Sequence, residues 1–310
     1  MKNAYKIIIS GLDYAGKTSI LTALDKKYNF QKEITELKPT IKVEYHQFNF
    51  LDNLVFIWDM GGQKNYRDIY QERKEIYFAG TDLMVYVIDI QDKDRYEDSL
   101  SYLNNVLEFF EKSEEDVPII ISFHKYDPEL RDDAELLFNI NKLKEQISNE
   151  HPSFKILFQQ SSIYDIISIV QLISYALSLF DEAFFELSEL MEDYLTNTFN
   201  CTSLILFDEN GIIISEFYSD SINPEIYVEL IDSIKEHLFI LKRMQEEDFK
   251  EDYNFFSLEN KLLSYLHKIN IDSQRFFISA VIEENNKDNL LNKFPELVDD
   301  TIQILESILL

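Results

Sequence analysis

The sequence contains little cysteine and little histidine. A single cysteine, Cys201, occurs among 310 residues, which excludes a disulfide framework and a zinc site built from several cysteines. The five histidines are scattered without HxH or HxxxH spacing, so we expect no histidine-rich metal site. Hydrophobic residues make up 45% of the chain, which is typical of a folded globular protein rather than a disordered one.

Signals for membrane insertion and export are also missing. No run of 18 apolar residues occurs, so no transmembrane helix is predicted. A strand-like pattern begins at Tyr5, which leaves no room for a signal peptide, and Lys2 stands where myristoylation needs glycine. We therefore expect a cytoplasmic protein without a direct membrane anchor, which reaches a membrane only through a partner.

Basic residues are scarce. Lys and Arg number 29 against 57 Asp and Glu, a net charge of −28. Nucleic acids and anionic membrane surfaces are negative themselves, so we expect neither as a partner. The imbalance is strongest in residues 181–310, which hold 9 basic and 28 acidic residues against 20 and 29 in residues 1–180. This excess predicts solvated faces, with a docking face for a basic partner as the alternative.

Glycine is rare as well, and its placement is informative. Four of the six glycines lie in two short segments, 11–18 (GLDYAGKT) and 59–63 (DMGGQ). The first segment matches the phosphate-loop pattern GxxxxGK[ST], between a strand-like run at 5–10 and a helical pattern at 17–27. The backbone N–H groups of such a loop surround phosphates, and the lysine reaches the β- and γ-phosphates. The predicted nucleotide-binding residues of this segment are Gly11, Asp13, Tyr14, Ala15, Gly16, Lys17, Thr18 and Ser19.

A magnesium site is predicted next to this loop. Asp59 follows the strand-like run 53–58, and a carboxylate at the end of a buried strand beside a phosphate loop holds Mg²⁺. Thr18 would supply a hydroxyl ligand. Thr40, which precedes the strand-like run 41–50, is placed to close over Mg²⁺ and the γ-phosphate. The predicted metal ligands are therefore Thr18, Thr40 and Asp59, with Mg²⁺ as the cofactor.

The second glycine segment predicts a hydrolytic site. The amide of Gly62 is placed to meet the γ-phosphate, and the side chain of Gln63 can orient an attacking water. Gln63 and Lys17 are the predicted catalytic residues. A tight Gly-Gly turn leading into a helix would explain the same letters, but it does not explain the phosphate loop upstream.

A third motif predicts the choice of base. The apolar run 117–123 is followed by His124, Lys125 and Asp127. A carboxylate there can accept two hydrogen bonds from the edge of guanine, whereas adenine offers no such pair of donors. A further run at 154–159 leads to the residues expected beside guanine O6, which are Ser162 and Ile163.

These motifs resemble those of the small GTPases of the Ras superfamily. GLDYAGKTS and WDMGGQ look most like the Arf branch, whereas HKYD and SSIYD resemble the Rag/Gtr branch. The resemblance implies a switch that binds GTP or GDP, with segments 33–45 and 60–75 changing conformation. It also implies dimerisation and docking on partners. Tyr14 departs from the small residue of Arf proteins, and its phenol would either cover the phosphates or pack on a switch.

The order of elements predicts an α/β fold, a P-loop GTPase fold with a mostly parallel, doubly wound sheet in residues 1–181. Residues 182–310 read as helix 182–198, strands 201–207 and 212–218, helix 224–247, three strands and a helix, which matches a roadblock/longin-like α+β domain. Strands of the first half are predicted at 5–10, 41–50, 53–58, 82–89, 117–123 and 154–159, and helices at 17–27, 64–78, 95–111, 132–149 and 164–180. The last strands and helix are predicted at 253–258, 261–268, 275–283 and 290–309.

The sequence therefore predicts a Mg²⁺-dependent GTPase with low turnover that forms a homo- or heterodimer through residues 182–310. No arginine can be assigned as a finger in cis, so intrinsic hydrolysis is expected at roughly 10⁻⁴–10⁻² s⁻¹. The activating and exchange factors are not identified by the sequence. Three alternatives stay open: a nucleotide-locked scaffold that hardly hydrolyses GTP, an Arf-like GTPase of membrane trafficking, and a P-loop ATPase.

Overall fold

The computed structural model describes residues 4–26, 38–50, 53–113, 116–179, 183–209, 212–219, 253–257, 261–272 and 274–309. Within these residues the chain divides into two compact units, Met1–Leu172 and Ile173–Leu310. Each unit has its own sheet and is described by itself. No helix in the described part is long and apolar enough to cross a bilayer. The predicted helix at 224–247 and the Asn210-Gly211 turn lie outside the described residues.

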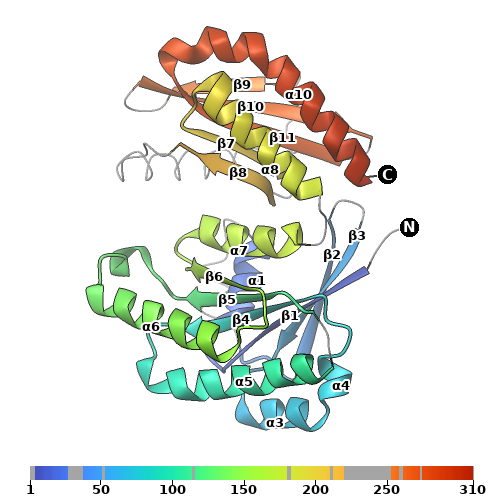
Figure 1. Cartoon of the computed structure of the whole chain (residues 1–310), viewed down its shortest axis with the longest axis vertical. Helices are drawn as coiled ribbons and strands as arrows, with labels where there is room; N and C mark the ends of the chain where they lie inside the picture. Colours follow the sequence, from blue (N-terminus) through green and yellow to red (C-terminus); the bar gives the residue numbers. More distant parts are fainter. Residues whose placement is uncertain are drawn as a thin grey trace. The chain divides into compact units, whose positions relative to one another are not determined.

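The first unit is built on a six-stranded sheet with the order β2-β3-β1-β4-β5-β6 (Figure 1). Neighbouring strands run parallel except β2, which pairs antiparallel with β3. This arrangement confirms the predicted mostly parallel, doubly wound sheet, and the antiparallel strand β2 lies at its edge. The strands are β1 (Ala4–Gly11), β2 (Val43–Phe50), β3 (Asn53–Met60), β4 (Leu83–Asp89), β5 (Ile119–His124) and β6 (Ile156–Ser161).

Helices cover both faces of this sheet because its central strands are apolar on both sides. All residues of β5, and all of β4 except the last, are buried. In Figure 1, α5 and α6 lie on one face, and α1 with the beginning of α7 lies on the other. The helices are α1 (Lys17–Lys26), α3 (Lys64–Glu72), α4 (Lys74–Tyr77), α5 (Tyr96–Lys112), α6 (Ala134–Glu150) and α7 (Ile166–Ser178).

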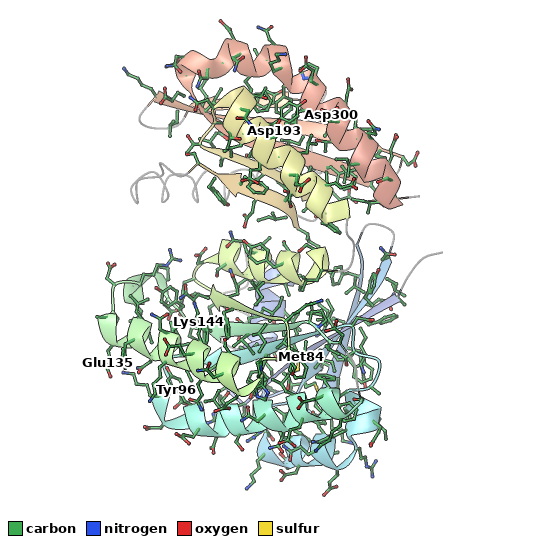
Figure 2. The ribbon with its side chains drawn as sticks, viewed as in Figure 1. Met84, Tyr96, Glu135, Lys144, Asp193 and Asp300 are labelled. Atoms are coloured by element: carbon green, nitrogen blue, oxygen red, sulfur yellow. The ribbon has the colours of Figure 1, made fainter. Side chains whose placement is uncertain are left out.

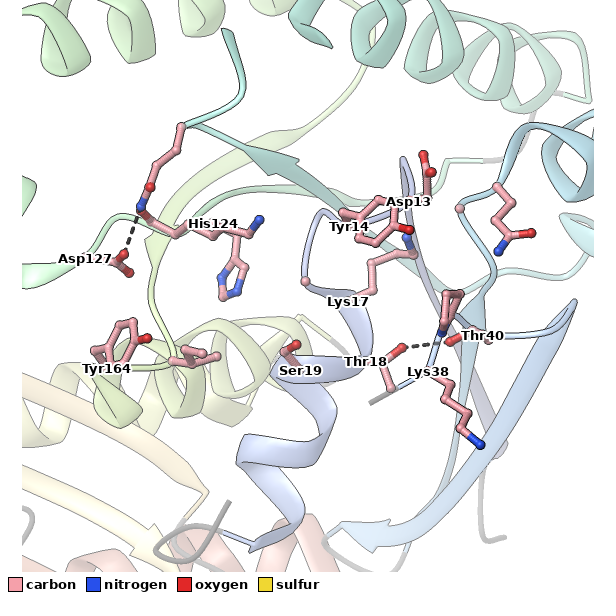
Figure 3. A pocket seen from close by; sticks show the side chains of 17 residues that line it. Asp13, Tyr14, Lys17, Thr18, Ser19, Lys38, Thr40, His124, Asp127 and Tyr164 are labelled. Carbon is pink, nitrogen blue, oxygen red and sulfur yellow. Dashed lines mark hydrogen bonds between the residues drawn. The ribbon is translucent and has the colours of Figure 1, made fainter. Parts of the chain in front are cut away.

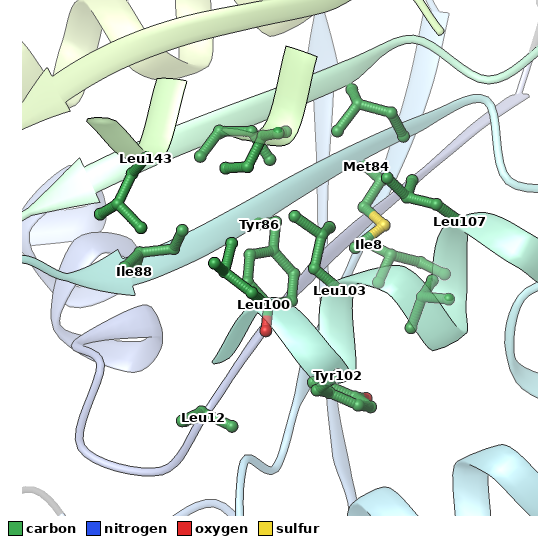
Figure 4. Packing of buried hydrophobic residues seen from close by; sticks show 14 of the residues in the cluster. Ile8, Leu12, Met84, Tyr86, Ile88, Leu100, Tyr102, Leu103, Leu107 and Leu143 are labelled. Atoms are coloured by element: carbon green, nitrogen blue, oxygen red, sulfur yellow. The ribbon is translucent and has the colours of Figure 1, made fainter. Parts of the chain in front are cut away.

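A buried apolar core lies between the sheet and the helices on one of its faces. Ile8 and Met84 of the strands lie near Leu103 and Leu107 of α5, Ile88 lies beside Leu143 of α6, and all are buried (Figure 4). Tyr86 is also fully buried, and its hydroxyl donates to the carbonyl of Ser99, 2.7 Å away. A buried phenol needs such a partner, and the bond pins the start of α5 against β4.

Several helices of this unit differ from the predicted ones, and α7 begins at Ile166 rather than at residue 164. The predicted helix 64–78 is interrupted at Arg73, whose backbone (φ −133°, ψ 47°) leaves the helical region between α3 and α4. The break lets the rings of Tyr70 and Tyr77 meet edge to face at 4.7 Å. Short 3₁₀ turns, Lys93–Arg95 and Pro128–Leu130, precede α5 and α6. Asp133 caps α6 by accepting from the N–H groups of Glu135 and Leu136, which sets its later start.

The second unit contains a five-stranded antiparallel sheet with the order β8-β7-β11-β10-β9. Two helices lie on one face of it in Figure 1, α8 (Ala183–Asp193) and α10 (Lys287–Leu309). Figure 2 shows Asp193 and Asp300 on these neighbouring helices, which are joined by a 2.8 Å hydrogen bond from the Tyr194 hydroxyl to Asp300. The strands are β7 (Ser203–Asp208), β8 (Ile213–Tyr218), β9 (Tyr253–Ser257), β10 (Leu262–Ile271) and β11 (Gln274–Glu283).

This sheet with its helices fits a roadblock/longin-like domain, as predicted. The first helix continues as a π-helical turn, Tyr194–Phe199, and ends where Asn200 adopts a left-handed conformation (φ 48°). The buried face of α10 includes Phe294, whose ring meets that of Tyr265 edge to face at 4.6 Å. Aromatic packing of this kind anchors the closing helix on the sheet.

Candidate functional site

The carboxyl ends of the parallel strands surround a cavity of about 450 Å³ (Figure 3). Ligands of doubly wound sheets bind at this edge. Most residues predicted from the motifs line it: Asp13, Tyr14, Gly16, Lys17, Thr18, Ser19, Thr40, Gly62, Gln63, His124, Lys125, Asp127 and Ile163. The structure places four predicted residues outside the lining, Gly11, Ala15, Asp59 and Ser162. Asp59 and Ser162 still bond directly to lining residues.

The phosphate loop joins β1 to α1 and leaves no room for a side chain at Gly16. A Cβ atom there would lie 2.4 Å from Cδ2 of the His124 imidazole, and the backbone has a φ of +97°. Glycine is therefore required both sterically and conformationally. The close approach puts the first residue of the base motif directly against the loop that is predicted to hold phosphates.

The side chain of Lys17 is buried inside this loop. It is only 6% exposed, and Nζ donates to the carbonyls of Gly11 at 3.1 Å and Leu12 at 2.6 Å. Burial lowers the pKa of Lys17 to about 8, although the nearby charges of Asp59 and Asp13 oppose this shift. An anion placed in the loop would offer the ammonium group a stronger partner than the two carbonyls.

The three predicted metal ligands converge on one point. The Thr18 hydroxyl donates to Asp59 Oδ2 at 2.6 Å, the Thr40 hydroxyl donates to the same oxygen at 3.2 Å, and the two hydroxyls lie 2.8 Å apart (Figure 3). Asp59 is fully buried, and its Oδ1 has no hydrogen-bond partner. Burial raises the pKa of this carboxyl, and the hydroxyl bonds and Lys17 counteract the rise.

This donor set fits a small hard cation. Mg²⁺ prefers oxygen ligands and is held in nucleotide sites by few protein groups, with phosphates and water completing the octahedron. The orphaned Oδ1 of Asp59 is an acceptor that a cation or its water shell would satisfy. Thr18 and Thr40, whose hydroxyls contact Oδ2 of the same carboxylate, would supply further oxygen ligands. On the neighbouring strand, Glu44 and His46 bring further ligand atoms within 4.8 Å of Asp59, and the carboxylate of Glu44 adds negative potential.

Switch residues pack on the phosphate loop. The carbonyl of Gly62 accepts from the N–H of Asp13 at 3.0 Å and from Nε of Arg67 at 2.9 Å. A Cβ atom on Gly62 would lie 2.3 Å from the Asp13 nitrogen, so only glycine allows this contact. Gln63 follows immediately, lines the cavity, and precedes α3 without a capping bond to it. Its side chain is therefore not committed to the start of the helix.

The base motif forms the other end of the cavity. Asp127 Oδ1 accepts from the Ser162 hydroxyl at 2.6 Å, and Oδ2 accepts from Nε2 of Gln91 at 2.8 Å (Figure 3). Nζ of Lys125 pairs with Asp89, which fixes the lysine side chain at the wall of the cavity. The carboxylate of Asp127 is thus oriented by two donors while each oxygen keeps a lone pair for a base.

Sequence reasoning missed several residues of this site. Gln91 and Tyr164 line the cavity, and Lys38 does so from the segment before Thr40. Arg95 reaches the phosphate loop from the 3₁₀ turn before α5. Gln91 and Arg95 both follow β4, so polar residues just after a buried strand were the available signal.

A comparison with protein families identifies the chain. Residues 6–235 match the family model described as the Gtr1/RagA G protein conserved region. The chain belongs to the Gtr1/RagA G-protein family. It is therefore a small GTPase of the Ras superfamily, and the predicted resemblance to the Rag/Gtr branch is confirmed.

The Gtr1/RagA chain also resembles Arf-like proteins. It is 29% identical over 150 residues to ADP-ribosylation factor-like protein 3 of Saccharomyces cerevisiae, 34% over 122 residues to that of Chlamydomonas reinhardtii, and 37% over 105 residues to ADP-ribosylation factor-like protein 5 of Caenorhabditis elegans. These matches span 47%, 39% and 34% of this chain, and 73%, 63% and 53% of the relatives.

A solved structure similar to this chain is described as the Arl6 BBS3 small GTPase from Trypanosoma brucei with bound nucleotide analogue GppNp. Its TM-score is 0.43 at 19% identity, and the match covers 57% of this chain and 97% of that one.

His124 gives this Gtr1/RagA protein an acid-sensitive position. The ring is buried, and Nδ1 lies 2.8 Å from the Ser161 hydroxyl. Burial, with a smaller contribution from the charge of Lys125, lowers the pKa of His124 from 6.5 to about 3. Below pH 6.5 this histidine is protonated in the unfolded chain but stays neutral in the folded chain. The free energy of unfolding therefore falls as pH drops from 6.5 toward 3.

We expect His124→Asn to remove this sensitivity. The wild type should lose up to about 1.4 kcal/mol more stability per pH unit below 6.5 than the variant. Melting temperatures at saturating GDP between pH 7 and 4.5 measure the difference. The exposed His46→Asn is the matched control and should follow the wild type. Parallel curves for wild type and His124→Asn would contradict the buried neutral imidazole.

Proposed function

We propose that this protein is a Mg²⁺-dependent switch that binds GTP and hydrolyses it slowly. The observation that carries the proposal is the convergence of Thr18, Thr40 and Asp59 at one end of the cavity that holds Asp127 at the other. One end suits a metal-bound triphosphate, and the other suits guanine. When bound, Mg²⁺ neutralises charge that develops on the transferring phosphoryl group.

The chain's own residues have distinct tasks in this proposal. The backbone N–H groups of the loop bind the phosphates, Lys17 turns its ammonium from the loop carbonyls to them, and Gln63 positions the water. Thr40 and Gly62 lie in segments 33–45 and 60–75, which are proposed to order around the γ-phosphate and to relax after hydrolysis. Residues 27–37 lie outside the described part of the chain.

The second unit is proposed to mediate dimerisation and docking. We place the functional boundary between residues 181 and 182, with a GTPase domain in 1–181 and a roadblock/longin-like dimerisation domain in 182–310. The antiparallel sheet of the second unit, with α8 and α10, supports this proposal, because such sheets and helices commonly pair between two protein chains. Recruitment to a membrane, where it occurs, would use a partner. The mass of the full chain under native conditions tests whether it is a dimer.

Single-turnover hydrolysis tests the switch. Gln63→Leu removes the water-positioning amide, so we expect at least about a tenfold slower loss of GTP in the presence of Mg²⁺. Removal of Mg²⁺ should abolish hydrolysis in both proteins. Gln146→Leu, on α6 and outside both the cavity lining and the switch segments, is the matched control and should hydrolyse like the wild type.

A nucleotide-locked scaffold is the second candidate, favoured by Tyr14. This residue lines the cavity, is 74% exposed and has a left-handed backbone (φ 61°), so its phenol stands beside the phosphate loop where an activating group would enter. The scaffold predicts equal, negligible hydrolysis by wild type and Gln63→Leu, together with tight nucleotide binding.

A further inference from the structure

An acidic residue stands where phosphates are expected to bind. Asp13 is the third residue of the phosphate loop, and it lines the nucleotide cavity. A carboxylate in this position repels an anion, with an energy that falls only as the inverse of distance and is strengthened by partial burial. The loop therefore needs a counter-charge if it is to hold a di- or triphosphate tightly.

Arg95 supplies that counter-charge from the far side of the loop. Its Nη1 donates to the backbone carbonyl of Asp13 at 2.9 Å, and its Nη2 forms an ion pair with Asp13 Oδ1. Both donors of the guanidinium fork thus go to one residue, a geometry that fixes orientation as well as charge. The two side chains are 30% and 28% exposed. Asp13 also lines a small cleft with Arg95 behind the loop, whereas Arg95 is absent from the described lining of the nucleotide cavity.

The position of Arg95 is set by the core. It ends the 3₁₀ turn that leads into α5, and the next residue, Tyr96, donates its hydroxyl to the carbonyl of Ile90. Further along α5, Leu100 and Leu103 are buried against the sheet. A guanidinium anchored in this way loses little further freedom on pairing, so the pair is pre-organised.

The third polar group of Asp13 is also engaged. Its N–H donates to the carbonyl of Gly62, so the residue connects α5, the phosphate loop and the second switch segment. The carbonyl and the carboxylate are held by Arg95 and the amide by Gly62. Rotation of the carboxylate toward the cavity would break the ion pair.

We propose that Arg95 is a positioning residue that neutralises Asp13 and holds its carboxylate away from the phosphates of the bound nucleotide. The inference rests on the proposed function. It makes nucleotide affinity depend on the Asp13–Arg95 pair in proportion to the phosphate charge. Guanosine, which carries no phosphate, is indifferent to the pair.

A double-mutant cycle tests the pair. Arg95→Gln leaves Asp13 unneutralised and should weaken GTP about tenfold, GDP less, and guanosine by less than twofold. Asp13→Asn should bind GTP as tightly as the wild type or more tightly, because Arg95 then adds positive charge without a carboxylate to offset. The double variant should recover wild-type affinity within about threefold. Calorimetric or fluorescence titrations of the full chain with Mg²⁺ measure all four proteins.

Lys93→Gln is the matched control. Lys93 lies in the same 3₁₀ turn and pairs with Glu135 at the surface, 2.7 Å away, so its replacement removes one positive charge nearby without touching Asp13. We expect an unchanged GTP affinity. Equal weakening by Lys93→Gln and Arg95→Gln, an equal loss for guanosine, or no recovery in the double variant would overturn the inference. A tenfold loss in Asp13→Asn alone would also overturn it, and this outcome remains readable if Arg95→Gln fails to fold.

Failure of the proposed function gives a different result. In that case the wild type itself binds neither GTP nor GDP, and no variant can be ranked. If the wild type binds and the cycle shows no coupling, only the role of Arg95 is wrong.

Discussion

Replacing Asp127 with asparagine is expected to lower the affinity for GDP by about 10⁴-fold and to create affinity for xanthosine diphosphate. Guanine presents two donors, N1–H and the N2 amino group, to the two carboxylate oxygens. An asparagine keeps one acceptor and opposes the amino group with its own N–H₂. Xanthine carries a carbonyl at that position and accepts from the amide. Competition of both diphosphates against a fluorescent guanine nucleotide measures the change.

The surroundings of Asp127 tolerate this substitution. The Ser162 hydroxyl, which donates to Oδ1 at 2.6 Å, can turn to accept from an amide, while Gln91 continues to donate to the remaining oxygen. Asp116→Asn is the matched control, because this carboxylate pairs loosely with Lys155 at the surface and lies far from the cavity lining. Unchanged guanine selectivity in Asp127→Asn would refute the assigned role. Equal displacement of the probe by ATP in the wild type would support the ATPase alternative.

The core of the site could be predicted because its chemistry depends on short segments. A strand, a glycine loop and a helix are contiguous in the chain, so Lys17 and Thr18 are placed by local sequence alone. Asp59 and Asp127 each end or follow a buried strand, and parallel strands bring their carboxyl ends to one edge. The order of the sheet, β3-β1-β4-β5, then sets these residues around one cavity.

The supporting residues could not be predicted because they depend on which strands are neighbours. β4 lies between β1 and β5, so the segment after it passes between the phosphate loop and the base motif. Gln91 and Arg95 come from this segment and contact Asp127 and Asp13, which are 36 and 82 residues away in sequence. No motif marks them. A run of apolar residues predicts a strand, but it does not predict which other strands are its neighbours in the sheet.

The helix break at Arg73 was missed for a related reason. Residues 64–78 contain neither proline nor glycine, so local propensity favours one continuous helix. The break follows from tertiary contacts. Tyr70 is buried, with its hydroxyl bonded to the carbonyl of Lys42, while Tyr77 must turn back onto its ring. Such contacts override propensity by more than the few tenths of a kcal/mol that separate most residues.

Lys17→Ala is expected to weaken GTP and GDP by roughly 10²–10³-fold and to leave guanosine within about twofold. The ammonium is buried, and loss of one partner of a buried ion pair costs about 3–5 kcal/mol, which converts to an affinity loss of this order. Guanosine is expected to contact the opposite end of the cavity, where Asp127 lies, so its affinity should not report on Lys17. Titrations at pH 7 with Mg²⁺ measure the three affinities, and Lys112→Ala, an exposed lysine on α5, is the matched control.

The pH dependence gives an independent check on the same group. Because burial lowers the pKa of Lys17 to about 8, the free protein loses this proton at mildly alkaline pH. Phosphates bind the charged form, so GDP affinity should fall above pH 8 by up to about tenfold per pH unit, until the higher pKa of the complex limits uptake of the proton. Guanosine contains the same base as GDP, so protonation changes of the base affect both affinities equally. The ratio of GDP to guanosine affinity therefore reports on the protonation of Lys17. In Lys17→Ala this ratio should not vary between pH 7 and 9, and a wild-type ratio that is equally flat would show that the loop holds phosphates without this ammonium.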